Sequence, residues 1–152
     1  MIGFMSVEIQ AEADFSRARR RAFFGRIAAR LRRECSRLLA FDKIHLAHNR
    51  RGLGLRDVEV SKIVGSVGRH EAFDRDFMPT KASLAERWMM VDRAFHRGLD
   101  LPAVRLYKVG NSYFVEDGNH RVSVARYQGV ETIEADVIEF FPLYGAHYRR
   151  TA

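Results

Sequence analysis

Cysteine is almost absent from this sequence, and long hydrophobic runs and internal repeats are missing. The single cysteine, Cys35, excludes an internal disulfide framework and any metal site built from several cysteines. No apolar run approaches the roughly 20 residues of a membrane-spanning helix. Residues 1–5 also lack the basic flank and long apolar stretch of a signal peptide. We therefore expect a cytoplasmic protein with no membrane partner.

Acidic residues are scarce in the first third of the chain. Residues 12–57 carry 13 Lys and Arg against 5 Asp and Glu, whereas the rest of the chain carries 13 against 14. Apolar residues recur there at helical spacing and predict one long amphipathic helix over residues 14–41. We expect Cys35 to be buried on the apolar side of this helix. The residues predicted on that side are Phe15, Phe23, Ile27, Leu31, Cys35 and Leu38.

The remaining surface of this predicted helix carries arginines. Their even spread favours contact with nucleic-acid phosphates, in DNA or RNA, over base reading, since no groove-reading motif accompanies them. Two other interpretations stay open: the solvated face of a docked helix, and a surface for a partner such as a second copy of the chain. A membrane-surface helix would be richer in lysine and tryptophan. The predicted nucleic-acid contacts are Arg19, Arg20, Arg26, Arg30 and Arg33.

Residues 42–56 contain asparagine and glycine and indicate an irregular linker. His45 and His48 in this segment lack a third ligand at convincing spacing, so no metal site is predicted. Alternating valine and isoleucine then predict a strand over residues 58–63. A polar loop is expected over residues 69–76.

A helix is predicted over residues 81–97, with Gly98 as its end. One side of it is expected to belong to the core and carries Leu84, Trp88, Val91 and Phe95.

Residues 113–127 predict a strand, a tight turn and a helix in succession. The N-terminus of a helix attracts anions such as phosphate, because it presents unpaired N–H groups and the positive end of the helix dipole. His120 and Arg121 would lie there, where cations are disfavoured unless an anion neutralises them. The alternative is an ordinary turn in which Asp117 or Asn119 only caps the helix.

The pentapeptide Asp-Gly-Asn-His-Arg at residues 117–121 resembles the Asp-Gly-His-His-Arg signature of the ParB/sulfiredoxin-like superfamily. Residues 101–106 and 129–137 resemble the strands on either side of that motif, so the resemblance covers about residues 58–139. It implies a bound nucleoside di- or triphosphate, with Mg²⁺ as a companion ion. The residues that it places at the phosphates are Gly118, Asn119, His120 and Arg121.

The polar loop is a second candidate site. In ParB-like proteins the equivalent region faces the phosphates, which implies such a role for Arg69 and His70. His70 and Glu71 together resemble the His-Glu pair of the superfamily's free-serine kinases, in which the glutamate is the base. The resemblance thus implies catalytic roles for Glu71 and Asp117, with Asp117 assisting or holding Mg²⁺, and a phosphate contact for Lys81. Alternatively, the loop's charges only pair with one another.

Two departures from the superfamily's pattern narrow the range of functions that the resemblance implies. Asn119 stands where sulfiredoxin needs its cysteine, which excludes sulfiredoxin chemistry. Because few residues follow Glu139, we expect no helix-turn-helix domain of the kind that partition proteins carry. We expect an α/β fold with a small mixed sheet, in which residues 1–56 form the basic helix and linker and residues 57–152 form the ParB/sulfiredoxin-like domain.

Three functions remain open for this fold. The first is a nucleotide-binding regulatory or DNA-associated protein, and the second is an NTPase, small-molecule kinase or other phosphotransferase. The third is a nonenzymatic interaction module. A homodimer fits each of them.

Overall fold

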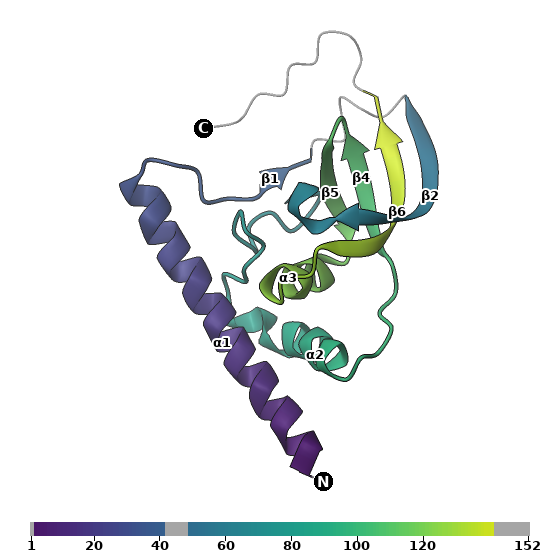
Figure 1. The fold of residues 1–152 in the computed structure, drawn as a ribbon. Helices are drawn as coiled ribbons and strands as arrows, with labels where there is room; N and C mark the ends of the chain where they lie inside the picture. Colours follow the sequence, from purple (N-terminus) through teal and green to yellow (C-terminus); the bar gives the residue numbers. More distant parts are fainter. Residues whose placement is uncertain (1, 42–48, 142–152) are drawn as a thin grey trace.

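The computed structural model describes residues 2–41 and 49–141 and shows a mixed sheet with three α-helices on one side of it (Figure 1). The expected α/β class and the N-terminal helix are confirmed. The helices and strands are α1 (Ile2–Leu31), β1 (Leu39–Ala40), β2 (Arg50–Glu59), β3 (Ile63–Ser66), α2 (Ala85–His96), β4 (Val104–Val109), β5 (Ser112–Asp117), α3 (Asn119–Tyr127) and β6 (Thr132–Phe140). Two short 3-10 helices, η1 (Val60–Lys62) and η2 (Ala82–Leu84), precede β3 and α2.

The six strands are arranged in the order β1-β3-β5-β4-β6-β2. The β4–β5 hairpin lies at the centre, β4 pairs in parallel with β6, and β5 pairs in parallel with β3. Because β3 and β5 run in the same direction, the loop after β3 and the turn after β5 emerge at the same edge of the sheet. This parallel pair brings the two sequence-predicted sites together.

The strand β2 corrects the sequence interpretation. Residues 50–56, expected to belong to an irregular linker, are its first part and pair antiparallel with β6. The single strand predicted over residues 58–63 is instead the end of β2, the turn η1 and the start of β3. Residues 42–48, with His45 and His48, lie outside the described residues.

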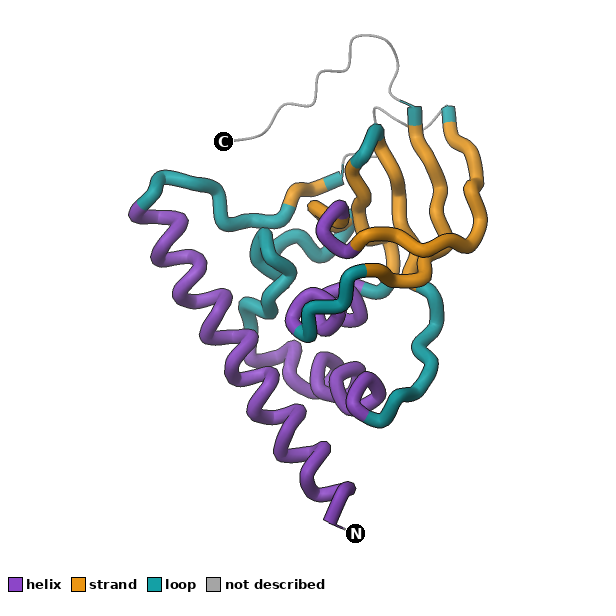
Figure 2. The backbone as a smooth tube through the Cα atoms, in the orientation of Figure 1, coloured by secondary structure: helices purple, strands orange, loops and turns teal. Residues whose placement is uncertain are grey.

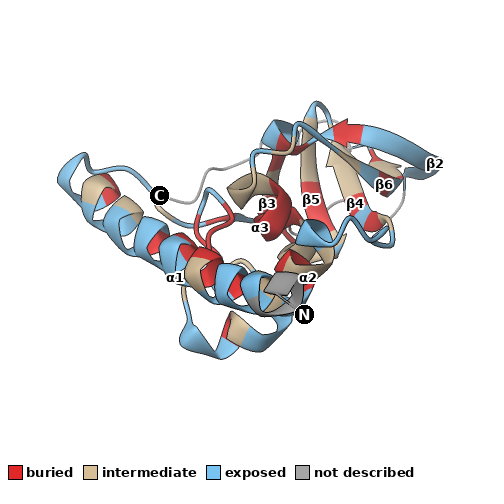
Figure 3. Cartoon of the chain, turned by 60° about the horizontal axis from the view of Figure 1, so that its bottom comes forward, coloured by how far each residue is buried: buried red, intermediate tan, exposed pale blue. Residues whose placement is uncertain are grey.

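The helix α1 begins and ends earlier than predicted, and a different side of it is buried. Its buried residues follow a spacing of four and three, with small alanines that allow α1 to approach α2 closely (Figure 3). Phe23, Ile27 and Leu31, expected in the core, are 52%, 42% and 81% exposed. Cys35 follows the helix and is exposed, so its predicted burial is wrong as well. The buried side consists of Ala11, Asp14, Phe15, Ala18, Ala22 and Ala29.

The main core lies between the sheet and the helices. Leu84, Trp88 and Val91 of the η2–α2 segment are buried as predicted, whereas Phe95 is 39% exposed. The indole N–H of Trp88 donates to Ser123 Oγ at 2.8 Å, and that hydroxyl donates in turn to the carbonyl of Phe77. This buried chain joins α2, α3 and the loop before η2, which runs irregularly beside the helices (Figure 2).

The opposite face of the sheet has a smaller apolar cluster. Phe41, Phe114 and Phe140 are buried there, and the ring of Phe41 lies 5.3 Å and 5.5 Å from the other two. Phe41, which directly follows β1, thus packs against the sheet. None of the helices that the structure describes is long and apolar enough to cross a membrane.

Candidate anion-binding site

The turn between β5 and α3 depends on a glycine. Gly118 precedes the first residue of α3 with a φ of +103°, a backbone conformation that residues with a side chain rarely adopt. A Cβ at this position would lie 2.6 Å from Cγ1 of Val104 on the neighbouring strand. Glycine therefore allows the chain to turn tightly against β4 and start the helix at the sheet edge.

Among the residues that the structure describes, no side chain caps the N-terminus of α3. The first N–H groups of an α-helix have no partner within the helix, and Gly118 has no side chain to accept from them. Asp117, a candidate cap, instead accepts from Arg121 Nη2 at 2.9 Å. The site therefore retains the anion-attracting N–H groups that the sequence predicts.

The side chain of Arg121 stabilises the turn through hydrogen bonds. Its Nη1 donates to the carbonyl oxygens of Pro102 and Ala103, the latter at 3.0 Å, and its Nη2 pairs with Asp117. Its side chain is only 15% exposed. These bonds hold the segment before β4 against the turn, and the predicted contact of Arg121 with phosphate stays a prediction.

Arg69 is held beside the turn by the end of β3. Its backbone N–H donates to Ser66 Oγ at 3.2 Å, and the buried Ser66 hydroxyl donates to the carbonyl of Val115 at 3.4 Å. The N–H of Val67 donates to the same carbonyl at 2.9 Å. These bonds tie the loop after β3 to β5, two residues before Asp117.

His120 is the most perturbed group of the site. Burial, with the charges of Arg87 and Arg69, lowers the pKa of His120 to about 4, so its ring is neutral at pH 7. The ring lies edge-on to Phe73, with 5.4 Å between the centroids. Its orientation leaves the buried Nε2 atom without a hydrogen-bond partner among the described residues.

Two further buried atoms of the predicted site lack hydrogen-bond partners in the described part of the chain. They are Nδ1 of His70 and Oδ1 of Asn119. Buried polar atoms in proteins almost always have partners, so an unpaired group requires an explanation such as a bound ligand or water. Together with His120, they lie in the loop after β3 and in the first turn of α3.

Arg87 is a residue of the site that the sequence interpretation missed. It lies on the exposed side of α2, yet its charge acts on His120 together with that of Arg69. Neither guanidinium forms an ion pair or hydrogen bond with a described residue. No local pattern in the sequence indicated this role, because α2 approaches the turn only through tertiary packing.

The proposed catalytic residues are less closely connected to the turn. Glu71 is exposed, and its carbonyl accepts from Thr80 Oγ1 at 3.0 Å. Lys81 is exposed just before η2. Among the described residues, no hydrogen bond or ion pair joins either side chain to the turn. Asp117 is at the turn but is paired with Arg121.

The other charges of the loop do not pair with each other as the alternative interpretation suggested. Asp74 is buried, and its Oδ1 accepts from the N–H groups of Asp76 and Met78 at 3.0 and 2.8 Å. Arg75 reaches Glu34 at 3.2 Å. Asp74 therefore shapes the loop that carries Arg69 and His70.

The arginines predicted to contact nucleic acid are all exposed. Four of them lie on α1, whereas Arg33 follows the helix with a φ of +56°. They share this surface with the exposed side chains of Phe23, Phe24, Ile27 and Leu31. The face is thus mixed, basic and apolar.

No protein-family model matches the sequence, and no curated protein matches it. Among solved structures, the chain is similar to sulfiredoxin from Arabidopsis thaliana, with 20% sequence identity and a TM-score of 0.38. The alignment covers 57% of this chain and 86% of that chain. At this level of similarity, only the site's own residues indicate its chemistry.

Proposed function

We propose that the protein binds the phosphate groups of a nucleoside di- or triphosphate at the N-terminus of α3 and serves as a nucleotide-dependent regulatory protein. The observation that carries this proposal is the environment of His120. Its half-buried imidazole has a buried Nε2 atom without a hydrogen-bond partner, and the two cations whose charges reach the ring have no ion-pair partner among the described residues. An anion at this position would relieve the repulsion and satisfy the unpaired donors.

The donors fit phosphate in number and kind. The candidate donors are two guanidinium groups, an imidazole nitrogen and the free N–H groups of a helix, and they come from α2, the loop after β3 and α3. Guanidinium forms bidentate, charge-assisted hydrogen bonds with phosphate, and helix N-termini bind phosphate through backbone N–H groups. A terminal di- or triphosphate would use such a set more fully than a single carboxylate.

Magnesium has suitable oxygen donors beside this set. Glu71 is exposed in the loop and Asp117 ends β5, and Mg²⁺ prefers one or two carboxylates together with phosphate oxygens. A bound Mg²⁺ would neutralise charge on the phosphates. In the absence of the ion, the bond from Arg121 keeps Asp117 oriented.

The test is a calorimetric titration with ATP, ADP, GTP and CTP, each with and without Mg²⁺. We expect Arg69→Gln and Arg87→Gln each to weaken binding about tenfold or more, since a hydrogen bond to a charged group contributes roughly 1.5–3 kcal/mol. Arg56→Gln is the matched control, because it removes the same charge from β2 at the far edge of the sheet. Equal affinities in all four proteins, or no binding of any nucleotide, would contradict the proposal and favour an interaction module.

A phosphotransferase is the second candidate, because Glu71 is an exposed carboxylate in the same loop as Arg69. A base at this position would accept the proton of a hydroxyl that attacks the terminal phosphate. Glu71→Gln should then retain nucleotide affinity within a few-fold and reduce turnover by about 10² to 10⁴. Mass spectrometry of ATP incubated with a pool of hydroxyl metabolites measures this. A regulatory protein would give no acceptor-dependent product.

A further inference from the structure

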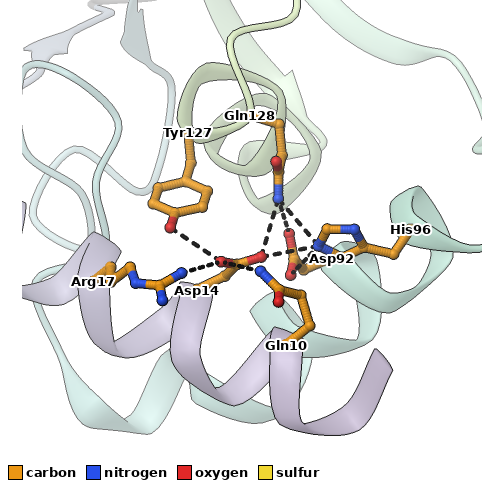
Figure 4. A network of polar contacts seen from close by, with 7 residues as sticks. All are labelled: Gln10, Asp14, Arg17, Asp92, His96, Tyr127 and Gln128. Carbon is orange, nitrogen blue, oxygen red and sulfur yellow. Dashed lines mark hydrogen bonds and ion pairs between the residues drawn. The ribbon is translucent and has the colours of Figure 1, made fainter. Parts of the chain in front are cut away.

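A second polar cluster lies where α1, α2 and α3 meet (Figure 4). Its centre consists of Asp14 from α1 and of Asp92 and His96 from the last turns of α2. One donor atom from each of these three side chains lies within 4.8 Å of the other two. The residues around them are Gln10, Arg17, Tyr127 and Gln128. Neither the nucleotide proposal nor the motif at residues 117–121 accounts for this cluster.

Several polar atoms converge on a single nitrogen. His96 Nε2 lies 2.9 Å from Asp14 Oδ2, 3.3 Å from Asp92 Oδ2 and 3.3 Å from Gln128 Nε2. An imidazole nitrogen that carries a proton can donate it well to only one acceptor. A proton on His96 Nε2 can therefore satisfy only one of the two carboxylate oxygens beside it.

Asp92 supplies an independent indication of a missing partner. It is fully buried, and its Oδ2 atom accepts no hydrogen bond from any described residue, although it lies 3.3 Å from His96 Nε2 (Figure 4). Two carboxylates thus share a buried space, where a cation would stabilise both.

The C-terminal ends of α2 and α3 add negative electrostatic potential at the cluster. Asp92 and His96 lie in the last turns of α2, and Gln128 directly follows the last residue of α3. The carboxyl end of each helix carries the negative end of its dipole. Two dipoles and two carboxylates therefore favour a cation, and Arg17, at 3.3 Å from Asp14 Oδ1, contributes only from the exposed rim.

We propose that Asp14 Oδ2, Asp92 Oδ2 and His96 Nε2 bind a divalent transition-metal ion, of which Zn²⁺ is the representative. Rotation of the Gln128 amide would present its oxygen as a fourth ligand in place of the Nε2 group that now donates to Asp14 and Asp92. Tetrahedral Zn²⁺ with bonds of about 2.0–2.1 Å places its ligands about 3.4 Å apart. The present separations of His96 Nε2 from Asp14 Oδ2 and Asp92 Oδ2, 2.9 and 3.3 Å, lie close to this value, and all three ligand atoms lie within 4.8 Å of one another.

The donor set selects the class of metal. Imidazole suits zinc and the neighbouring transition metals, whereas Mg²⁺ and Ca²⁺ prefer sites made entirely of oxygen. The spacing of four residues between Asp92 and His96 brings both side chains to the same side of α2. The side chain of His96 is 24% exposed and gives the ion a route of entry.

The first experiment titrates the metal-free full chain with Zn²⁺ by calorimetry and with Co²⁺ by visible absorption, which reports the coordination geometry. Because His45 and His48 could bind metal independently, both are first replaced in His45→Gln/His48→Gln. We expect one ion per chain in this background. Asp92→Asn and His96→Phe should each weaken Zn²⁺ binding by about 100-fold or more, since loss of an outer-shell partner alone costs 10- to 100-fold.

The second experiment identifies the ligands directly. X-ray absorption at the zinc edge should show one imidazole and several oxygen ligands, and the imidazole signal should vanish in His96→Phe. Circular dichroism establishes that both variants are folded; Asp92→Asn keeps the shape of the side chain and is the safer of the two. No equimolar binding to His45→Gln/His48→Gln, or binding of unchanged affinity when Asp92→Asn or His96→Phe is added to that background, would overturn the proposal.

Discussion

At the scale of single residues, the candidate anion site depends on a few positions with specific tasks. Gly118 permits the turn, Arg121 braces it, and Ser66 holds the loop of Arg69 against β5. His120 remains neutral in the free protein because of burial and neighbouring positive charge. The sequence motif identified the turn, and its assignment of Arg121 to phosphate stays a prediction. In the structure, Arg121 forms three hydrogen bonds to the protein itself.

The replacement Gly118→Ala should destabilise the protein by about 1–3 kcal/mol, because an L-residue is strained at this φ and its Cβ would overlap Val104. Gly110→Ala is the control, since Gly110 also has a positive φ of +58° but has no atom within 4 Å of the added Cβ. Urea unfolding measures both free energies. The steric explanation fails if the two variants lose equal stability.

A pH effect is expected from His120. Its pKa lies near 6.5 in the unfolded chain and at about 4 in the folded protein, so the unfolded state binds more protons between these values. This contribution to stability is fully present above about pH 6.5 and is lost progressively as the pH falls toward 4. His120→Gln should flatten the pH dependence of the unfolding free energy in this window, by at most about 1.4 kcal/mol per pH unit. An unchanged slope would show that the ring is not protected from protonation.

At the scale of secondary-structure elements, predictions succeeded where the signal was local. The segment from β4 to β6 was expected in the correct order, because its turns, apolar alternation and helical spacing lie within about forty residues. The strand β2 was missed because it is rich in arginine and glycine and pairs with β6, far away in the sequence. The cluster of Asp14, Asp92 and His96 was not predicted either, because Asp14 is far from the other two residues in the sequence.

The buried side of α1 shows another limit. Large apolar residues were taken as the core side, but close helix packing against α2 requires small side chains, and Ala18 and Ala22 are fully buried there. We predict that Ala18→Leu destabilises the protein by about 1–3 kcal/mol through overpacking. Ile27→Gln should change stability by no more than about 0.5 kcal/mol, because Ile27 is exposed. If instead the side predicted from the sequence were buried, Ile27→Gln would be the more destabilising change. Thermal unfolding of the two variants distinguishes these arrangements.

At the scale of the whole molecule, much of the basic charge lies on α1 and on the residues that directly follow it, and three further arginines lie on β2. The anion site at the N-terminus of α3 and the acidic cluster beyond its C-terminus are separated by this nine-residue helix, which is about 14 Å long. The protein thus has an exposed arginine surface, a candidate anion site and a proposed metal-binding cluster, each built by a different set of elements.

If the arginines of α1 track nucleic-acid phosphates, binding should be insensitive to sequence and should fall steeply with salt. For duplex DNA, the slope of log K against log salt is about −0.9 for each phosphate neutralised. The double variant Arg26→Gln/Arg30→Gln should reduce that slope by about 2. Fluorescence anisotropy at several salt concentrations measures it. Absence of binding to duplex and single strands at low salt would leave a protein partner as the role of this surface.

The position of β2 at one border of the sheet has a consequence for how the protein behaves at high concentration. An outer strand exposes N–H and C=O groups to which strands of other molecules can add, which is a route to aggregation. Here that border carries Arg50, Arg51 and Arg56, and its pairing register shifts between Gly52 and Gly54. Repulsion between arginines and the interrupted backbone both oppose such addition. The arginines and glycines of β2, which made this strand hard to recognise in the sequence, thus also oppose association between molecules.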